Sequence, residues 1–141
     1  MVSSSARLLV LVVVGFLSMR EVEGASAQDY RVSSAGSTLR LNSGSTGTVV
    51  IRLEALRGFH FSEETPLLAS LSSSAGLSLA KQRLDRKDLA TSTSTMLEWR
   101  TSYSARAIGT QSVKADLVFF LCTEDDCQRL NAPYAVTIGV E

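Results

Sequence analysis

The sequence contains two cysteines, Cys122 and Cys127, separated by a short acidic segment at residues 123–126. No other cysteine is present to pair with them, so the chain carries either one local disulfide or one dithiol. Antiparallel strands place facing alpha carbons about 4.5 to 5.5 Å apart, within reach of a disulfide, so a hairpin would bring the two cysteines face to face. Such a bond is a structural cross-link or, where a thiolate can reach it, a centre for thiol–disulfide exchange.

The surroundings of the pair bear on both roles. Closing so small a ring stabilises a fold by about 2 kcal/mol in the chain-entropy model, which is useful but modest. The acidic turn disfavours a thiolate by like-charge repulsion, and only Arg129 lies near in sequence to oppose it. If exchange occurs, we expect attack at Cys127, because Cys122 ends an apolar strand in which Phe119 and Phe120 should bury it. Both roles stay open at this level.

The beginning of the chain has the pattern of a secretory signal. Arg7 supplies a positive charge, residues 8–17 are an apolar run, and residues 25–27 (ASA) offer a cleavage site, so we assign residues 1–27 to a signal peptide. The apolar run is too short for a stable membrane span, and a retained amphipathic anchor is the alternative. Export to the periplasm, or secretion, would place the cysteines where disulfides persist.

Charge is balanced over the whole chain, with 14 Lys and Arg residues against 14 Asp and Glu residues. The signal segment contains two residues of each sign, Arg7 and Arg20 against Glu21 and Glu23, so the mature part is neutral as well. This balance gives no electrostatic basis for binding nucleic acid or anionic membranes. The length of 141 residues corresponds to one domain.

Alternation of apolar and polar residues is the clearest periodic signal after the signal segment. It occurs around residues 39–41, 48–56, 97–103 and 134–140. Each stretch is typical of a strand with one buried and one wet face, and turn residues separate the stretches. Short strands with little helical periodicity predict an all-β, immunoglobulin-like antiparallel β-sandwich.

We divide the chain into the signal segment 1–27, an N-terminal strand region at residues 28–45 and a sandwich domain at residues 46–141. Within the domain, residues 80–90 form a charged connection with room for one turn of helix, because Leu84 and Leu89 make a poor apolar face. Trp99 and Tyr103 share one face of a strand and are expected in the core, since sheets bury large aromatic residues at period two. A ligand-stacking platform is the alternative for these two.

Two separated motifs together resemble a known family. Gly58, His60, Phe61 and Ser62 form a Gly-aromatic strand start, and residues 119–122 (FFLC) lead through the acidic turn to Cys127. This order resembles the immunoglobulin-like N-terminal domain of the thiol:disulfide interchange protein DsbD. It is also similar to the sandwich domain that ends the thioredoxin-like NHL-repeat proteins, and the resemblance covers residues 46–141.

The resemblance implies a function in thiol–disulfide exchange. In the DsbD domain two cysteines receive electrons from a membrane partner and pass them to periplasmic thiol proteins, and an aromatic cap shields them between encounters. The matching residues are Cys122 and Cys127, and the implied partner is a thioredoxin-fold or other redox protein. The chain contains no Cys-x-x-Cys motif and is therefore not a self-sufficient thioredoxin.

Other candidate residues predict no further chemistry. His60 is followed by Glu63 and Glu64, but one histidine with two distant cysteines is weak evidence for zinc, so we expect no metal and no cofactor. The serines lack a nucleophile motif such as Gly-x-Ser-x-Gly, and no hydrolase is predicted.

Two functions follow. The first is an exported exchange module that passes reducing equivalents through Cys122 and Cys127, as an accessory domain of a protein-disulfide reductase without independent turnover. The alternative is a non-catalytic binding or scaffolding sandwich, in which the disulfide pins the last hairpin and free edge strands recruit a partner by strand addition.

Overall fold

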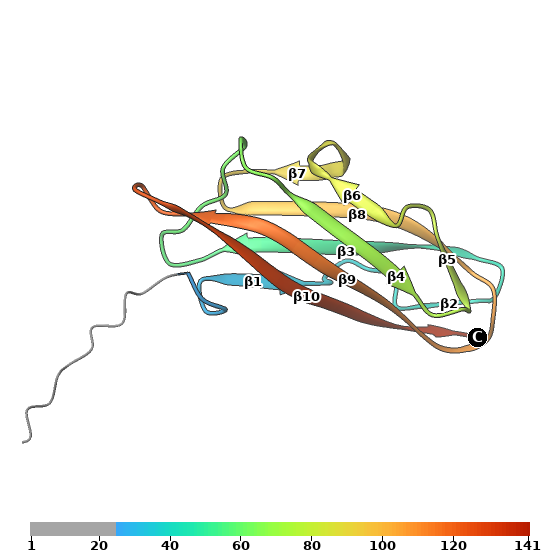
Figure 1. Ribbon diagram of the computed structural model, residues 1–141. Coiled ribbons are helices and arrows are strands. Elements are labelled where there is room, and N and C mark those ends of the chain that lie inside the picture. The colour runs from blue at the N-terminus through green and yellow to red at the C-terminus, as the bar shows by residue number, and fades with distance from the viewer. Residues whose placement is uncertain (1–24) are drawn as a thin grey trace, which may run out of the picture.

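The computed structural model describes residues 25–141, so nearly all of the predicted signal peptide lies outside the described residues. These residues form two five-stranded sheets that face one another as the two layers of a sandwich (Figure 1). The predicted all-β, immunoglobulin-like antiparallel β-sandwich is confirmed. Within residues 25–141, no helix is long and apolar enough to cross a membrane.

The first sheet has the order β1-β3-β8-β5, and β7 also pairs with β8. Its strands are β1 (Tyr30–Ser33), β3 (Thr46–Ala55), β5 (Leu77–Leu79), β7 (Leu89–Ser92) and β8 (Met96–Ala105). The second sheet has the order β2-β10-β9-β4-β6. Its strands are β2 (Arg40–Leu41), β4 (Leu68–Ser73), β6 (Arg83–Asp85), β9 (Gly109–Cys122) and β10 (Cys127–Val140).

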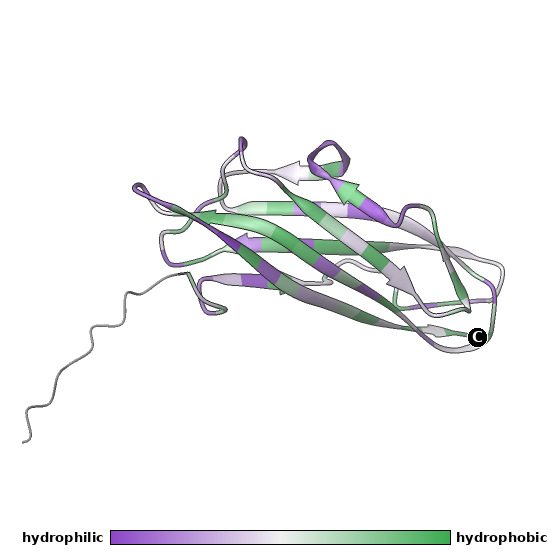
Figure 2. Cartoon of the chain, in the orientation of Figure 1, coloured by the Kyte–Doolittle hydropathy of each residue, from purple (hydrophilic) through white to green (hydrophobic). Residues whose placement is uncertain are grey.

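The core lies between the sheets and is built from alternate residues of the long strands, as the sequence pattern predicted. Apolar segments run along the strands, whereas the turns are mostly hydrophilic (Figure 2). Among the largest fully buried side chains are Ile51, Leu53, Leu97, Trp99, Tyr103, Leu117, Phe119, Leu121 and Ile138. Alternation therefore decides which face of each strand enters the core.

Trp99 and Tyr103 lie in this core rather than on a ligand platform, with 0% and 1% of their surface exposed. The Trp99 Nε1–H donates to the Asp85 carbonyl at 2.8 Å, and the Tyr103 hydroxyl donates to the Thr38 carbonyl at 2.7 Å. Each aromatic residue thus satisfies its buried polar atom while its ring fills the core.

The N-terminal segment visits both sheets. After β1 it follows β3, where the Ser37 hydroxyl accepts the Val50 N–H at 2.8 Å and the Thr38 N–H donates to the Thr48 carbonyl at 2.8 Å. It then crosses to the second sheet as β2, which pairs parallel with the end of β10. This parallel pair departs from a purely antiparallel sandwich, because the chain keeps its direction while it changes sheets.

The charged connection at residues 80–90 contains one short 3₁₀ turn, η1 (Arg86–Asp88), between β6 and β7. Asp85 and Asp88 cap it reciprocally: the Asp85 carboxylate accepts the Lys87 N–H at 2.8 Å and the Asp88 carboxylate accepts the Asp85 N–H at 3.0 Å. The predicted turn is present, but the expectation of a connection is wrong for the rest of the stretch, because β6 (Arg83–Asp85) and the start of β7 (Leu89–Ser92) pair within the two sheets and Leu84 is buried in the core.

Candidate functional site

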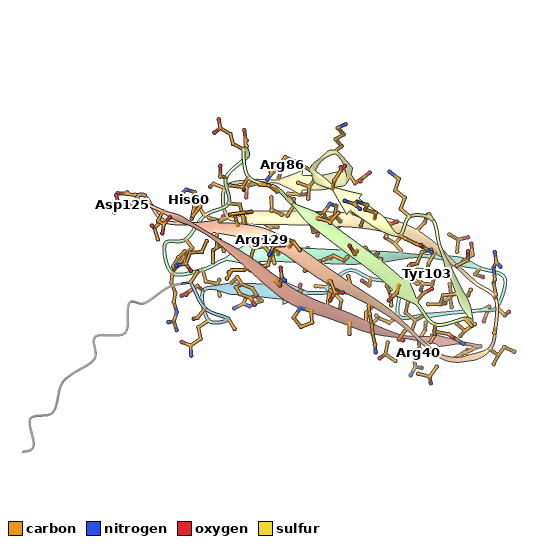
Figure 3. The ribbon with its side chains drawn as sticks, viewed as in Figure 1. Arg40, His60, Arg86, Tyr103, Asp125 and Arg129 are labelled. Carbon is orange, nitrogen blue, oxygen red and sulfur yellow. A yellow bond between two sulfur atoms is a disulfide. The ribbon has the colours of Figure 1, made fainter. Side chains whose placement is uncertain are left out.

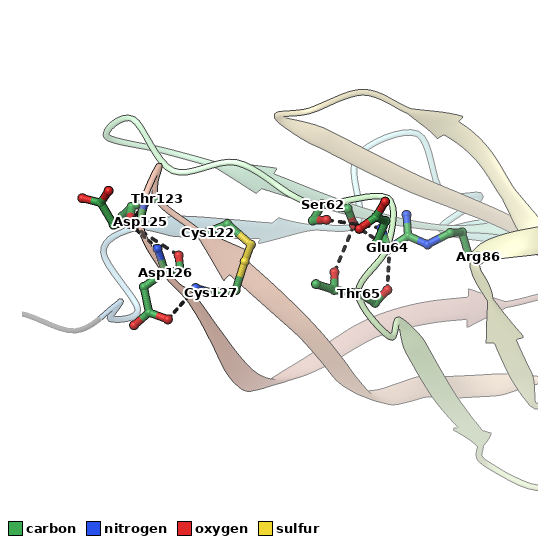
Figure 4. Close-up of a disulfide and its surroundings, with 9 residues drawn as sticks. All are labelled: Ser62, Glu64, Thr65, Arg86, Cys122, Thr123, Asp125, Asp126 and Cys127. Atoms are coloured by element: carbon green, nitrogen blue, oxygen red, sulfur yellow. Dashed lines mark hydrogen bonds between the residues drawn. A yellow bond between two sulfur atoms is a disulfide. The ribbon is translucent and has the colours of Figure 1, made fainter.

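Strands β9 and β10 form a long hairpin whose tip carries both cysteines. Their register is unbroken, with Cys122 opposite Cys127 at the tip and Gly109 opposite Val140 at the far end. A disulfide joins Cys122 and Cys127, with sulfur atoms 2.04 Å apart and alpha carbons 4.0 Å apart (Figure 4). The predicted hairpin geometry of the pair is confirmed.

The two cysteines differ in exposure. Cys122 is 1% exposed, as expected for the end of an apolar strand, whereas Cys127 is exposed. In the turn, the Thr123 N–H donates to the Asp126 carbonyl at 2.8 Å, and the Asp126 carboxylate accepts the Cys127 N–H at 2.8 Å. The side of the bond that solvent reaches is therefore the Cys127 side.

A segment distant in the sequence lies next to Cys122 on the side away from Cys127. The His60 N–H donates to the Cys122 carbonyl at 2.9 Å, and the Cys122 N–H donates to the His60 carbonyl at 2.8 Å, as an isolated antiparallel bridge. Facing residues of such a bridge carry their side chains on the same face, so the imidazole and the disulfide share one face of the sheet. The sequence reading gave His60 no role, because no local pattern reports this long-range pairing.

The loop after His60 is held in place by Arg86. Its guanidinium donates to the Ser62 carbonyl and to the Thr65 carbonyl, both at 2.9 Å (Figure 4). A side chain from η1 therefore anchors the loop whose first residues pair with Cys122. The motif at residues 58–62 and the cysteine hairpin, which are far apart in the chain, are neighbours in the fold.

The hairpin tip is acidic and exposed. Glu124, Asp125 and Asp126 are exposed, and none of them takes part in the ion pairs formed within residues 25–141. The same residues contain no cluster of metal-ligating side chains. The electrostatic character of the tip is thus an uncompensated negative charge beside the disulfide.

A second feature of β10 is its outer side, away from β9. There β2 pairs only with Gly139 and Val140. The Gly139 N–H donates to the Leu39 carbonyl at 2.8 Å, and the Glu141 N–H donates to the Leu41 carbonyl at 3.0 Å. Odd-numbered residues at this end of β10 therefore direct their backbone groups away from β9.

The same direction holds for every second residue back along β10, because the register with β9 is unbroken. Backbone groups without a hydrogen-bond partner among residues 25–141 belong to Arg129, Asn131, Pro133, Ala135 and Thr137. The side chains of these residues are exposed, whereas the intervening residues from 132 to 138 are buried. We call residues 129–137 the open edge of β10.

A hollow of about 370 Å³ lies beside the middle of the open edge, lined by Val32, Ser33, Ser34, Ala35, Pro133, Tyr134 and Ala135. The Tyr134 hydroxyl donates to the Val50 carbonyl at 2.8 Å and so ties β10 to β3. Burial raises the pKa of the Tyr134 hydroxyl, which keeps it protonated as a donor. The edge is therefore tied to the first sheet through Tyr134, while its outward backbone groups have no partner among residues 25–141.

One sequence signal could have identified the open edge. Proline lacks an N–H, so within sheets it is confined to edge strands, strand starts and bulges. Pro133 lies in the middle of the alternating run that ends the chain, where its nitrogen faces outward. A proline at that place predicts an edge strand and even indicates which residues face outward.

Comparisons with known proteins concern the fold only. A scan against protein-family models finds no match, and a search of curated proteins finds no significant match. Among solved structures, native alpha-2-macroglobulin of E. coli matches at 14% identity and a TM-score of 0.55 over 80% of this chain. This chain spans 7% of that alpha-2-macroglobulin chain.

Two other solved structures match with lower scores. A conjugative transposon lipoprotein from Bacteroides eggerthii is 10% identical, with a TM-score of 0.42 over 77% of this chain and 98% of its own. AggA, the major subunit of aggregative adherence fimbriae type I from Escherichia coli, is 8% identical, with a TM-score of 0.44 over 84% of this chain and 100% of its own. The strand order and pairing described above make the chain an immunoglobulin-like β-sandwich with a disulfide-linked terminal hairpin.

Proposed function

We propose that this protein is an extracytoplasmic, non-catalytic binding module that recruits an extended protein segment by strand addition to β10. The observation that carries the proposal is the open edge, where outward N–H and C=O groups at residues 129–137 have no partner within residues 25–141. An extended segment satisfies such groups with main-chain hydrogen bonds, and neighbouring pockets select its side chains. The hollow beside Pro133 supplies one such pocket.

The disulfide has a structural role in this proposal. It links the last residue of β9 to the first residue of β10 and so fixes the register from which the open edge extends. Replacing both cysteines by serine should cost about 2 kcal/mol of unfolding free energy and leave binding at the edge intact. Chemical denaturation of the double variant, together with a binding assay, separates the two effects.

A substitution at the edge tests the binding function. Ala135→Pro removes an outward N–H that β9 does not use, whereas Ala135→Ser retains it. Extended peptides selected from a random displayed library against the wild-type chain should bind it, bind the serine variant equally and fail to bind the proline variant. Amide chemical shifts should change at residues 129–137. Selected peptides that bind the proline variant as well as the wild type would refute this site.

Thiol–disulfide exchange is the second candidate, favoured by the exposure of Cys127 beside the buried Cys122. A thiolate of a redox protein would attack the Cys127 sulfur, form a mixed disulfide and release Cys122 as a thiolate. A second thiolate of the redox protein would then attack its own sulfur in the mixed disulfide and release Cys127 as a thiolate, which leaves Cys122 and Cys127 reduced and the redox protein with a disulfide. This role accords with the resemblance to the DsbD N-terminal domain, although residues 79–95, where the aromatic cap of that domain would lie, contain no Phe, Tyr or Trp.

His60 matters for that second candidate, because attack at Cys127 leaves the negative charge on buried Cys122. Burial and the nearby carboxylates disfavour that charge, whereas a hydrogen bond from an imidazole on the same face would stabilise it. His60→Asn should therefore slow reduction of the disulfide by small thiols. An unchanged rate would leave His60 with a packing role only.

The reduction potential of the pair decides between the two candidates. Equilibration against glutathione and dithiothreitol buffers should give a value below about −300 mV for a structural bond. A value between roughly −180 and −270 mV, together with a mixed disulfide trapped by Cys122→Ser on a thioredoxin-fold protein, would instead establish exchange.

A further inference from the structure

We propose that the strand which pairs with the open edge is β10 of a second copy of this chain, so that two molecules join antiparallel across a two-fold axis. The inference rests on the proposed function, since both use residues 129–137. It goes further by naming the partner, the relative direction of the two strands and their register. Three properties of β10 support it: the limits of the open edge, the parity of its outward groups and the charge at its two ends.

The limits of the edge restrict the register. Its unpartnered outward groups run from Arg129 to Thr137, because the Asp126 carboxylate already accepts the Cys127 N–H and β2 pairs with Gly139. A two-fold axis at Ala132 pairs residues 129–135 of the two copies, and Thr137 then faces Cys127 of the second copy. No part of the second strand then meets β2.

The alternation of outward backbone groups along β10 fits this register, because the odd-numbered residues, which direct them outward, then face one another. Arg129 faces Ala135 of the second copy and Asn131 faces Pro133, so residues with outward backbone groups meet one another. Pro133 contributes a carbonyl but no N–H, and its pair with Asn131 therefore forms one hydrogen bond where two are usual. An axis at Pro133 would instead place two prolines opposite each other without any donor.

Charge selects the antiparallel direction. Figure 3 shows Asp125 at the hairpin tip and Arg40 near the opposite end of β10. Arg40 faces Gly139, two residues beyond Thr137, and the acidic turn immediately precedes Cys127. In the antiparallel pair the carboxylates of each copy therefore reach Arg40 of the other, and the contact occurs twice. Parallel strands would place the two acidic turns side by side.

Sedimentation velocity of the exported, purified chain over a range of concentrations provides the first test. The wild-type chain should pass from monomer to dimer as concentration rises, and Ala135→Ser should do the same. Ala135→Pro should stay monomeric while its circular dichroism and melting temperature match those of the wild type, because its ring replaces an N–H that points away from β9.

A charge exchange tests the direction and register. Arg40→Glu should raise the dimer dissociation constant about tenfold, because two attractions become two repulsions. Adding Asp125→Arg to the same chain should restore association towards the wild-type value. Arg83→Glu, which makes the same charge change on β6, should leave association unchanged.

The outcomes distinguish this inference from the proposed function. A wild-type chain that stays monomeric at every concentration overturns the second-copy inference, and selected peptides that still bind at residue 135 would preserve the binding function. A dimer that Ala135→Pro does not weaken overturns the assignment to β10. Failure of the charge exchange to restore association overturns the antiparallel register.

Discussion

Strands β3 and β10 differ in how the same N-terminal segment covers them. Along β3 the segment first pairs as β1, from Tyr30 opposite Ala55 to Ser33 opposite Arg52. It then continues with Ser37, whose hydroxyl accepts the Val50 N–H and donates to the Val50 carbonyl at 3.3 Å. Along β10 the same segment pairs only with Gly139 and Val140. One edge is therefore closed over its length and the other is open.

Closure of a sheet edge therefore does not require a regular strand. Side-chain hydroxyls take the place of a backbone ladder along β3, where Val50 is fully buried and its polar groups must be satisfied. The outward groups of β10 face solvent, so water can satisfy them without a neighbouring strand. An open edge is thus stable in the monomer and available to a partner.

Hydrogen exchange at dilute, monomeric concentration should give the largest contrast. Amides of Ala132, Tyr134 and Val136 point to β9, whereas those of Asn131 and Ala135 point outward. The inward amides should exchange about 10³-fold more slowly, because they open only with much of the domain. Residue-resolved exchange by NMR measures this alternation. Equal protection of both sets would mean that the edge is covered.

Proline substitutions at two adjacent positions of β10 should give the second largest contrast. One position donates its N–H to β9 and the other directs its N–H outward, so the two variants should differ in unfolding free energy. Val136→Pro removes a buried N–H that bonds to β9 and should cost at least about 3 kcal/mol of unfolding free energy. Ala135→Pro should change the unfolding free energy by less than about 0.5 kcal/mol. Urea denaturation of both variants gives the comparison, and similar losses would show that residue 135 is not outward.

The unfolding free energy should fall when the Ser37 hydroxyl, which helps to close the edge of β3, is removed. Ser37→Ala leaves the buried Val50 N–H without its acceptor and should destabilise the fold by about 1 to 2 kcal/mol. Ser70→Ala, at an exposed position of β4, serves as the control and should have little effect. A loss no greater than that of the control would show that Val50 is satisfied in another way.

An ion pair on the outer face of the first sheet should give the smallest effect. Hydrogen bonding from Arg52, at 2.8 Å, lowers the pKa of the buried Glu98 carboxyl, and Arg100 adds to it at 3.1 Å. The pKa of Glu98 in the folded protein lies below the unfolded value of about 4.3. The stabilisation that its ion pairs give to the fold is therefore fully present above a pH of about 4.3. It is lost as pH falls through the folded pKa, by less than about 1 kcal/mol.

Urea midpoints at pH 7 and pH 3 measure the contribution of Glu98. Glu98→Gln has no carboxyl to titrate, so its midpoint should fall less between the two pH values than that of the wild type. An equal fall in both proteins would assign the pH dependence to other carboxyl groups.

Much of the fold could be predicted from local patterns in the sequence. Period-two alternation identifies the buried face of β3, β8 and β10, because side chains point to opposite faces in turn. It placed Trp99 and Tyr103 in the core, where both are buried. The spacing of Cys122 and Cys127 predicted the hairpin and its disulfide, because a facing pair brings two cysteines within bonding distance.

Residues close together in the chain therefore specify the strand faces, the core and the cysteine hairpin. Which strand lies beside which emerges only when distant segments pack together. This packing brought His60 to the buried cysteine and left the outward backbone groups of residues 129–137 without a hydrogen-bond partner among residues 25–141. The physical reason is that alternation specifies the face that a strand buries, whereas its pairing partner depends on contacts between distant segments that no local pattern encodes.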